Sequence, residues 1–153
     1  MLEGTDIAYI ARVATRRIMT VGITVGTRFP AYATSMGRVL LAALPAAGLE
    51  DYLARTEIRP LTPRAIGTRE GLLAELARVR AQGWCLLNQE LELGLMSIAA
   101  PVHDGPKVVA AINVSLQAQS VASRPDPEAY LDSVRTATVA TAELISADLS
   151  SGR

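Results

Sequence analysis

Apolar and polar residues alternate along the segment between Asn88 and Ser115, and this alternation predicts a buried hairpin. Successive side chains of a strand point to opposite faces, so every second residue shares a face. In Lys107–Ser115 the first face is expected to lie in the core, and it carries Val108, Ala110, Ile112 and Val114. The second face is small and partly polar, and it carries Val109, Ala111, Asn113 and Ser115.

The preceding run, Ser97–Val102, repeats this pattern. Ser97 and Ala99 share one face, opposed to Ile98 and Ala100. The turn between the two strands, His103–Pro106, contains Asp, Gly and Pro, which favour turns for separate steric reasons. A strand face of small residues with a few polar groups leaves space above it, which either a helix or a small molecule could occupy.

Helix and strand signals divide the rest of the chain into short elements. The expected helices run from Thr34 or Ser35 to about Leu44, from Pro45 to about Arg55, from Thr68 to a stop at Gly83, and onward from Pro127. The expected strands are Ile7–Ala14, Ile18–Thr24 and Trp84–Asn88, with Gly26–Pro30 as a loop. Strands at both ends of a helical middle, joined by hairpins, indicate an antiparallel α+β domain and not a doubly wound parallel sheet.

Composition narrows the class of protein. A chain of 153 residues that is half apolar is expected to form one domain with a sizeable core. Fifteen basic and fifteen acidic residues balance, so the chain carries no overall charge with which to bind nucleic acid or an anionic membrane. A turn signal only two residues from the start suggests that the sequence is part of a longer protein.

Other features of the composition predict the compartment and exclude some cofactors. No apolar run approaches the roughly 18 to 20 residues of a spanning helix, and Glu3 and Asp6 stand where a secretory signal would carry basic residues. The single Cys85 excludes an internal disulfide, so we expect a reducing cytoplasm. One Cys and one His do not make a zinc site, and neither a metal nor another cofactor is expected.

The segment Ala33–Gly37, at the start of the helix expected to run to about Leu44, is the first candidate for a catalytic or binding site. It superficially matches a nucleophile elbow with Ser35 as nucleophile, but no clear strand precedes it and the only histidine, His103, lies in a distant turn. A serine hydrolase is therefore a minor alternative. The unpaired backbone N–H groups of a helix start also suit an anion such as a carboxylate. An ordinary N-cap explains the same residues.

Several other polar residues have a structural and a functional interpretation. Asn113, Ser115 and Ser97 are either satisfied by nearby backbone or bind a ligand on the strand face. Arg28 lies in the loop before the helix start, where it could grip a carboxylate. The remaining candidates favour structural roles: Cys85 as a buried strand residue, His103 as a solvated turn residue, Glu90 and Glu92 as a solvated face, and Arg12, Arg16 and Arg17 as solvated strand ends.

Three segments of the chain resemble those of a known protein family. The segments GTRFPAYATSMGRVLLA (residues 26–42), NQELELGLMSIAAPV and VVAAINVS occur in the order and at the spacing of the effector-binding domain of IclR-type transcriptional regulators. The resemblance is greatest to the subgroup that includes PcaR, PcaU and PobR, and it covers nearly the whole chain, from about Gly4 to Leu144.

The resemblance implies a GAF-like or profilin-like α+β domain, a central antiparallel sheet flanked by helices. In the full-length protein a winged helix-turn-helix and a linker helix would precede it, so that operator DNA is bound only through a domain outside this chain. The chain itself, residues 1–153, would be a single effector-binding domain that forms a homodimer or homotetramer. Its effector would be a small carboxylate from aromatic-acid catabolism through the β-ketoadipate pathway.

The resemblance also implies a binding site between the helix start and the inner face of the sheet. Carried over position by position, Ser35 and Met36 would be backbone donors, Ser97, Asn113 and Ser115 side-chain partners, and Val21, Phe29 and Leu95 the apolar wall. Leu87 stands where some relatives with small-acid effectors have Asp, and Ser97 stands where they have Cys. These departures concern the identity of the ligand and not the location of its site. Besides a ligand-sensing domain and a serine hydrolase, a third interpretation of this chain is an oligomerisation domain that binds no ligand.

Overall fold

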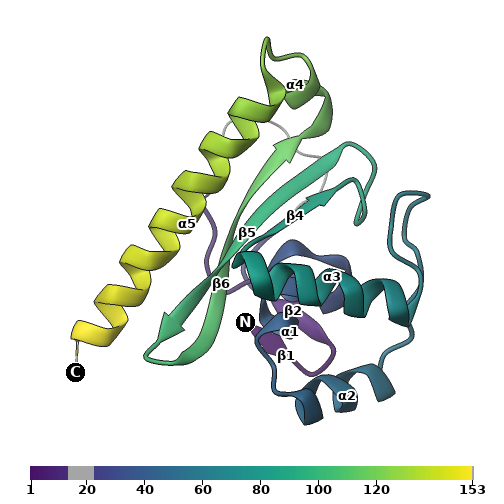
Figure 1. Cartoon of the computed structure of the whole chain (residues 1–153), viewed down its shortest axis with the longest axis vertical. Helices are drawn as coiled ribbons and strands as arrows, with labels where there is room; N and C mark the ends of the chain where they lie inside the picture. Colours follow the sequence, from purple (N-terminus) through teal and green to yellow (C-terminus); the bar gives the residue numbers. More distant parts are fainter. Residues whose placement is uncertain (14–22, 153) are drawn as a thin grey trace.

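The computed structural model describes residues 1–13 and 23–152, which form an α+β domain (Figure 1). The strands are β1 (Leu2–Glu3), β2 (Asp6–Ala8), β3 (Arg28–Pro30), β4 (Cys85–Asn88), β5 (Leu95–Asp104) and β6 (Lys107–Gln117). The helices are the 3-10 turn η1 (Ala31–Ala33), α1 (Ser35–Ala42), α2 (Ala46–Ala54), α3 (Arg69–Gln82), α4 (Ala118–Ala122) and α5 (Pro127–Ser151). The predicted fold class is confirmed.

The sheet β4-β5-β6 is the centre of the domain, and all of its strands are antiparallel. Figure 1 shows the long helix α5 along one side of this sheet, with α1 and α3 on the other. On the α5 side, Ala100 and Val102 of β5 pack with Ala142. On the α1 side, Ala99 belongs to the main core cluster, together with Leu41 and Leu76. The alternation predicted for β5 is confirmed, since its odd residues face α1 and its even residues face α5.

The face prediction for β6 needs one correction. The register between β5 and β6 shifts beside Val109, because Val102 pairs with Ala110 while His103 pairs with Val108. A β-bulge of this kind inserts one unpaired residue and breaks the alternation. Val108 therefore packs against the main core with Ala111, and not with Ala110 as predicted. Val114, also predicted to lie in the core, is 39% exposed.

The N-terminal residues form a second antiparallel sheet, β1-β2-β3. Residues 26–30 were predicted as a loop, but Phe29 pairs with Ile7 and residues 28–30 form strand β3. Phe29 is a single apolar residue between Arg28 and Pro30, so the sequence shows no alternation there. The pairing with β2 decides that these residues form a strand. The predicted strand pair Ile7–Ala14 and Ile18–Thr24 is wrong for most of the residues that the structure describes. Only Ile7 and Ala8 lie in a strand, β2, while residues 9–13, 23 and 24 form none. The remaining residues of the pair lie outside the described ranges.

The predicted helix boundaries are confirmed wherever a local capping residue specifies them. The Thr34 hydroxyl accepts a hydrogen bond from the backbone N–H of Gly37 at the start of α1. Thr68 caps α3 in the same way, and Gly83 ends α3 with a left-handed backbone at φ 81°. In the described ranges, no helix combines the length and apolar character needed to cross a membrane.

Candidate functional site

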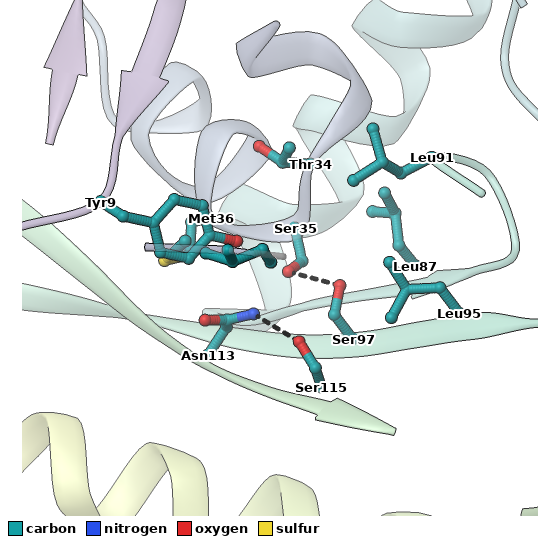
Figure 2. A pocket seen from close by; sticks show the side chains of 11 residues that line it. Tyr9, Thr34, Ser35, Met36, Leu87, Leu91, Leu95, Ser97, Asn113 and Ser115 are labelled. Atoms are coloured by element: carbon teal, nitrogen blue, oxygen red, sulfur yellow. Dashed lines mark hydrogen bonds between the residues drawn. The ribbon is translucent and has the colours of Figure 1, made fainter. Parts of the chain in front are cut away.

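A pocket opens between the start of α1 and the inner face of the central sheet (Figure 2). In this structure the pocket is narrow and partly open to solvent, with free space of about 10 Å³, roughly enough for one water molecule. The lining residues come from widely separated parts of the chain: Tyr9, Ile23, Thr34, Ser35, Met36, Leu87, Leu91, Leu95, Ser97, Asn113 and Ser115. The tertiary structure thus brings a helix start, a polar strand face and an apolar wall together at one site.

The helix start supplies backbone donors to this pocket. Because the Thr34 hydroxyl caps the N–H of Gly37, at 3.0 Å, the N–H groups of Ser35 and Met36 are left without an acceptor among the described residues. Ser35 is only 1% exposed, and its hydroxyl accepts a hydrogen bond from the Ser97 hydroxyl at 2.8 Å. Unpaired N–H groups at a buried helix start favour an anionic or carbonyl oxygen.

The inner face of the sheet supplies neutral polar groups. Ser97 of β5 lies directly opposite Ser115 of β6, and Ala99 lies opposite Asn113. The Asn113 amide donates a hydrogen bond of 3.3 Å to the Ser115 hydroxyl. The side chains Ser97, Ala99, Asn113 and Ser115 are small, as the sequence pattern predicted, and the space between this face and α1 is narrow. The hydroxyl and amide groups can both donate and accept hydrogen bonds.

The pocket has a polar and an apolar half. Leu87, Leu91 and Leu95 form one wall, which Figure 2 shows across the pocket from Tyr9 and Met36. In the register of the sheet Leu87 lies beside Ser97, so the apolar wall begins immediately next to the hydroxyl groups. A small ligand with an apolar body and an oxygen-bearing end fits this division.

Most of the predicted site residues lie where the sequence interpretation placed them. Six of the eight line the pocket: Ser35, Met36, Leu95, Ser97, Asn113 and Ser115. Val21 lies outside the described residues. Phe29 is not among the lining residues, because its ring packs edge-on against Tyr9, with ring centres 6.2 Å apart and an angle of 81°. Phe29 therefore supports the pocket wall from behind.

Other lining residues were missed at the sequence level: Tyr9, Ile23, Thr34, Leu87 and Leu91. Leu87 had a signal, because it departs from the family pattern at that position. Tyr9 and Ile23 lay within predicted strands, but the sequence did not show that either side chain reaches the pocket. Leu91 lies between Glu90 and Glu92, and the local sequence does not distinguish it from Leu93.

A buried ion pair beside the pocket corrects the interpretation of Glu90. Arg38 of α1 is 1% exposed, and its guanidinium donates two hydrogen bonds to the Glu90 carboxylate, at 3.0 and 2.7 Å. Glu90 also accepts from the backbone N–H of Ile66 at 3.1 Å. Glu90 is therefore not part of a solvated face. It joins α1 to the β4–β5 connection, which carries Leu91 of the pocket wall.

Arg28, which the sequence suggested as a carboxylate partner, has a different role. It forms an ion pair with Glu3, and its Nε lies 3.6 Å from the Asp6 carboxylate. A further hydrogen bond of 2.9 Å runs from Arg28 to the backbone oxygen of Glu3. Arg28 thus links the strands of the N-terminal sheet, and it does not line the pocket.

The chemistry of a hydrolase is not assembled around Ser35. His103 is exposed at the far end of β5, where its backbone N–H donates to the Ser146 hydroxyl at 2.8 Å. The Ser35 hydroxyl pairs instead with Ser97. Cys85 is fully buried, and burial raises the pKa of its thiol to about 12, so it stays protonated at neutral pH.

A pocket between a helix start and the face of a sheet, lined by apolar and a few polar side chains, is typical of domains that bind a small molecule. The sequence matches the family described as "Bacterial transcriptional regulator IclR C-terminal" over residues 1–147. The chain therefore belongs to the IclR family, as a C-terminal effector-binding domain of the Pca and PobR subgroup. The members it resembles are transcriptional regulators and not enzymes.

Individual relatives agree with this assignment. The Pca regulon regulatory protein of Pseudomonas putida is 53% identical over 116 residues, which cover 74% of this chain and 40% of that regulator. The chain spans less than half the length of the curated relatives that it matches. The structure of transcriptional regulator RHA06195 from Rhodococcus sp. RHA1 matches with a TM-score of 0.88 at 49% identity, over 97% of this chain and 59% of that chain.

A ligand complex is also among the similar structures. It contains a double mutant of the inducer-binding domain of PobR from Acinetobacter with 3-hydroxybenzoic acid. It matches with a TM-score of 0.82 at 29% identity, over 95% of this chain and 83% of that domain.

Proposed function

We propose that this domain senses a small carboxylate from aromatic-acid catabolism, which binds in the pocket below α1. The observation that carries the proposal is the pair of unpartnered N–H groups, of Ser35 and Met36, at a buried helix start that opens into the pocket. The carboxylate would lie at these groups. Ser97, Asn113 and Ser115 would bind its remaining oxygens, and Leu95 would contact its apolar body. The 3-hydroxybenzoic acid in the PobR complex supports the class of ligand.

The free energies indicate which groups must supply the affinity. A helix start stabilises an anion by about 0.3 to 1 kcal/mol when exposed and up to about 2 kcal/mol when partly buried. A micromolar dissociation constant requires about 8 kcal/mol. The helix start therefore orients the carboxylate, while burial against the leucine wall and hydrogen bonds to the sheet contribute most of the affinity.

We also propose a role for the domain within a longer regulator. Operator DNA would be bound by an N-terminal winged helix-turn-helix outside this chain, and the balanced charge of the chain agrees with this division of labour. The regulator would act in the cytoplasm, where its effector is produced. The chain, residues 1–153, would then be one effector-binding domain.

A thermal-shift screen of the purified chain tests the proposed ligand class. The screen compares benzoate, 3-hydroxybenzoate, 4-hydroxybenzoate, 3,4-dihydroxybenzoate, adipate and 3-oxoadipate with neutral analogues such as 3-hydroxybenzamide. At about one hundred times the dissociation constant, a bound acid adds roughly 2.7 kcal/mol of stability, which raises the melting temperature by several degrees. A chain that none of the acids stabilises would contradict the proposal.

Asn113→Ala is expected to remove most of the rise in melting temperature that the best acid produces in the wild type. Asn113 lines the pocket, and its side-chain hydrogen bond to another described residue, Ser115, is long at 3.3 Å. The melting temperature without ligand should therefore change by only a few degrees. Asn88→Ala, at the exposed end of β4, is the matched control and should keep the full rise. Equal shifts for the wild type and Asn113→Ala would show that the polar face of the sheet is not the effector site.

The domain is expected to self-associate, because a regulator that binds a two-fold symmetric operator functions as a dimer or a multiple of one. Light scattering on the purified chain at tens of micromolar should give the mass of a homodimer or homotetramer. A mass of 16.2 kDa, that of the single chain, throughout this range would contradict the expectation.

A further inference from the structure

Tyr9 differs from the other tyrosines of the core in the partners of its hydroxyl group. The Tyr52 hydroxyl accepts a hydrogen bond from the backbone N–H of Tyr32 at 3.1 Å. The Tyr32 hydroxyl donates to the backbone oxygen of Arg59 at 3.1 Å and accepts from its N–H at 3.3 Å. The Tyr9 hydroxyl has no hydrogen-bond partner within the described ranges, although Tyr9 lines the pocket.

The position of Tyr9 is nevertheless well defined. Its backbone N–H donates to the oxygen of Thr27 at 3.0 Å, and its backbone oxygen accepts from the N–H of Gly26 at 2.8 Å. Phe29 packs edge-on against the ring from behind, at 6.2 Å between ring centres. The ring is therefore held at the wall of the pocket by contacts that do not involve the hydroxyl.

The hydroxyl points into the polar half of the pocket. In Figure 2 the Tyr9 oxygen is directed toward the side of the pocket where Ser35 and Asn113 lie. The leucine wall is on the opposite side. A phenol in this position can reach an oxygen of a ligand whose apolar body lies against the leucines.

The protonation state suits donation of a hydrogen bond. Burial raises the pKa of Tyr9, and the nearby Arg12 offsets only part of this effect. The phenol thus stays neutral at physiological pH and keeps its proton. The Tyr9 hydroxyl oxygen is itself accessible, since every buried side-chain polar atom of the described residues has a partner, so a ligand oxygen can reach it.

We infer that the Tyr9 hydroxyl donates a hydrogen bond to an oxygen of the bound effector, and that Tyr9 is a specificity-determining residue of the pocket. This inference rests on the proposed function, since it concerns the same site. It restricts the effector to molecules that present an acceptor oxygen to the polar half of the pocket. A hydrogen bond to a ligand oxygen, in particular a charged one, typically changes affinity by about tenfold or more.

Tyr9→Phe tests the inference, because it removes only the hydroxyl and keeps the ring against Phe29. Isothermal titration of the six acids of the thermal-shift screen should show, for each acid that the wild type binds, a dissociation constant at least about tenfold higher in Tyr9→Phe. The melting temperature without ligand should stay the same or rise, since the hydroxyl has no partner in the described structure.

Tyr32→Phe is the matched control. It removes a hydroxyl that does have protein partners, so it should lower the melting temperature without ligand and leave the dissociation constant within about twofold. If the wild type and Tyr9→Phe bind the acids equally, the role of Tyr9 is overturned and the proposed function is left intact. A wild type that binds none of the six acids of the thermal-shift screen would overturn both.

Discussion

Arg38→Met is expected to lower the free energy of unfolding by about 3 to 5 kcal/mol, the usual effect of removing one partner of a buried ion pair. The Glu90 carboxylate would lose both guanidinium hydrogen bonds and keep only the N–H of Ile66. The backbone oxygen of Tyr32, which accepts from Arg38 at 2.8 Å, would lose that partner too. A loss of this size is a large fraction of the stability of an ordinary domain.

Urea unfolding followed by the fluorescence of the single Trp84 measures the effect. Two further variants separate the buried charge from simple loss of packing. Arg38→Met combined with Glu90→Leu should recover part of the loss, because the Glu90 charge is removed too. Glu75, which lies 3.8 Å from Arg38, keeps its ion pair with Arg78 at 2.7 Å. Asp51→Asn breaks an exposed ion pair with Arg55 and should change the stability by less than about 1 kcal/mol. An Arg38→Met variant as stable as Asp51→Asn would contradict the assigned role of the buried pair.

Gly37→Ala is expected to destabilise the chain by about 1 to 3 kcal/mol or more, the usual range for an overpacked core. On helix propensity alone, the same substitution within α1 would be favourable by about 1 kcal/mol. The tertiary contact reverses the sign, because an added Cβ would lie 2.0 Å from the backbone oxygen of Ala31. Backbone atoms cannot move aside as a flexible side chain can, so α1 would have to shift away from η1.

This shift would also displace the N–H groups of Ser35 and Met36, so binding of any acid identified in the screen should weaken together with stability. Gly48→Ala is the matched control in α2. Its added Cβ would meet its nearest neighbours, on Pro45 and Leu44, at 3.8 to 3.9 Å, an ordinary contact. Gly48→Ala should therefore stabilise the chain by about 0.4 to 1 kcal/mol. If both variants stabilise the chain equally, the close approach of α1 to η1 does not constrain position 37.

The sequence by itself determined the elements whose signals are local. Thr34 and Thr68 mark helix starts because a hydroxyl caps an N–H three residues later, and Gly83 marks a helix end because it adopts a left-handed backbone easily. The alternation of β5 and most of β6 predicted the polar face of the pocket. Six of the eight predicted site residues line that pocket because they lie on these locally specified elements.

Only the tertiary structure decided the contacts between residues far apart in the chain. Arg38 and Glu90 are separated by 52 positions, and nothing near Glu90 distinguishes a buried partner from a solvated carboxylate. The bulge at Val109 depends on the register with β5, and strand β3 depends on pairing with β2. Tyr9 lines the pocket while Phe29 packs against its ring, a contact between residues that are far apart in the chain. Register and long-range pairing depend on the whole sheet, so a single strand does not encode them.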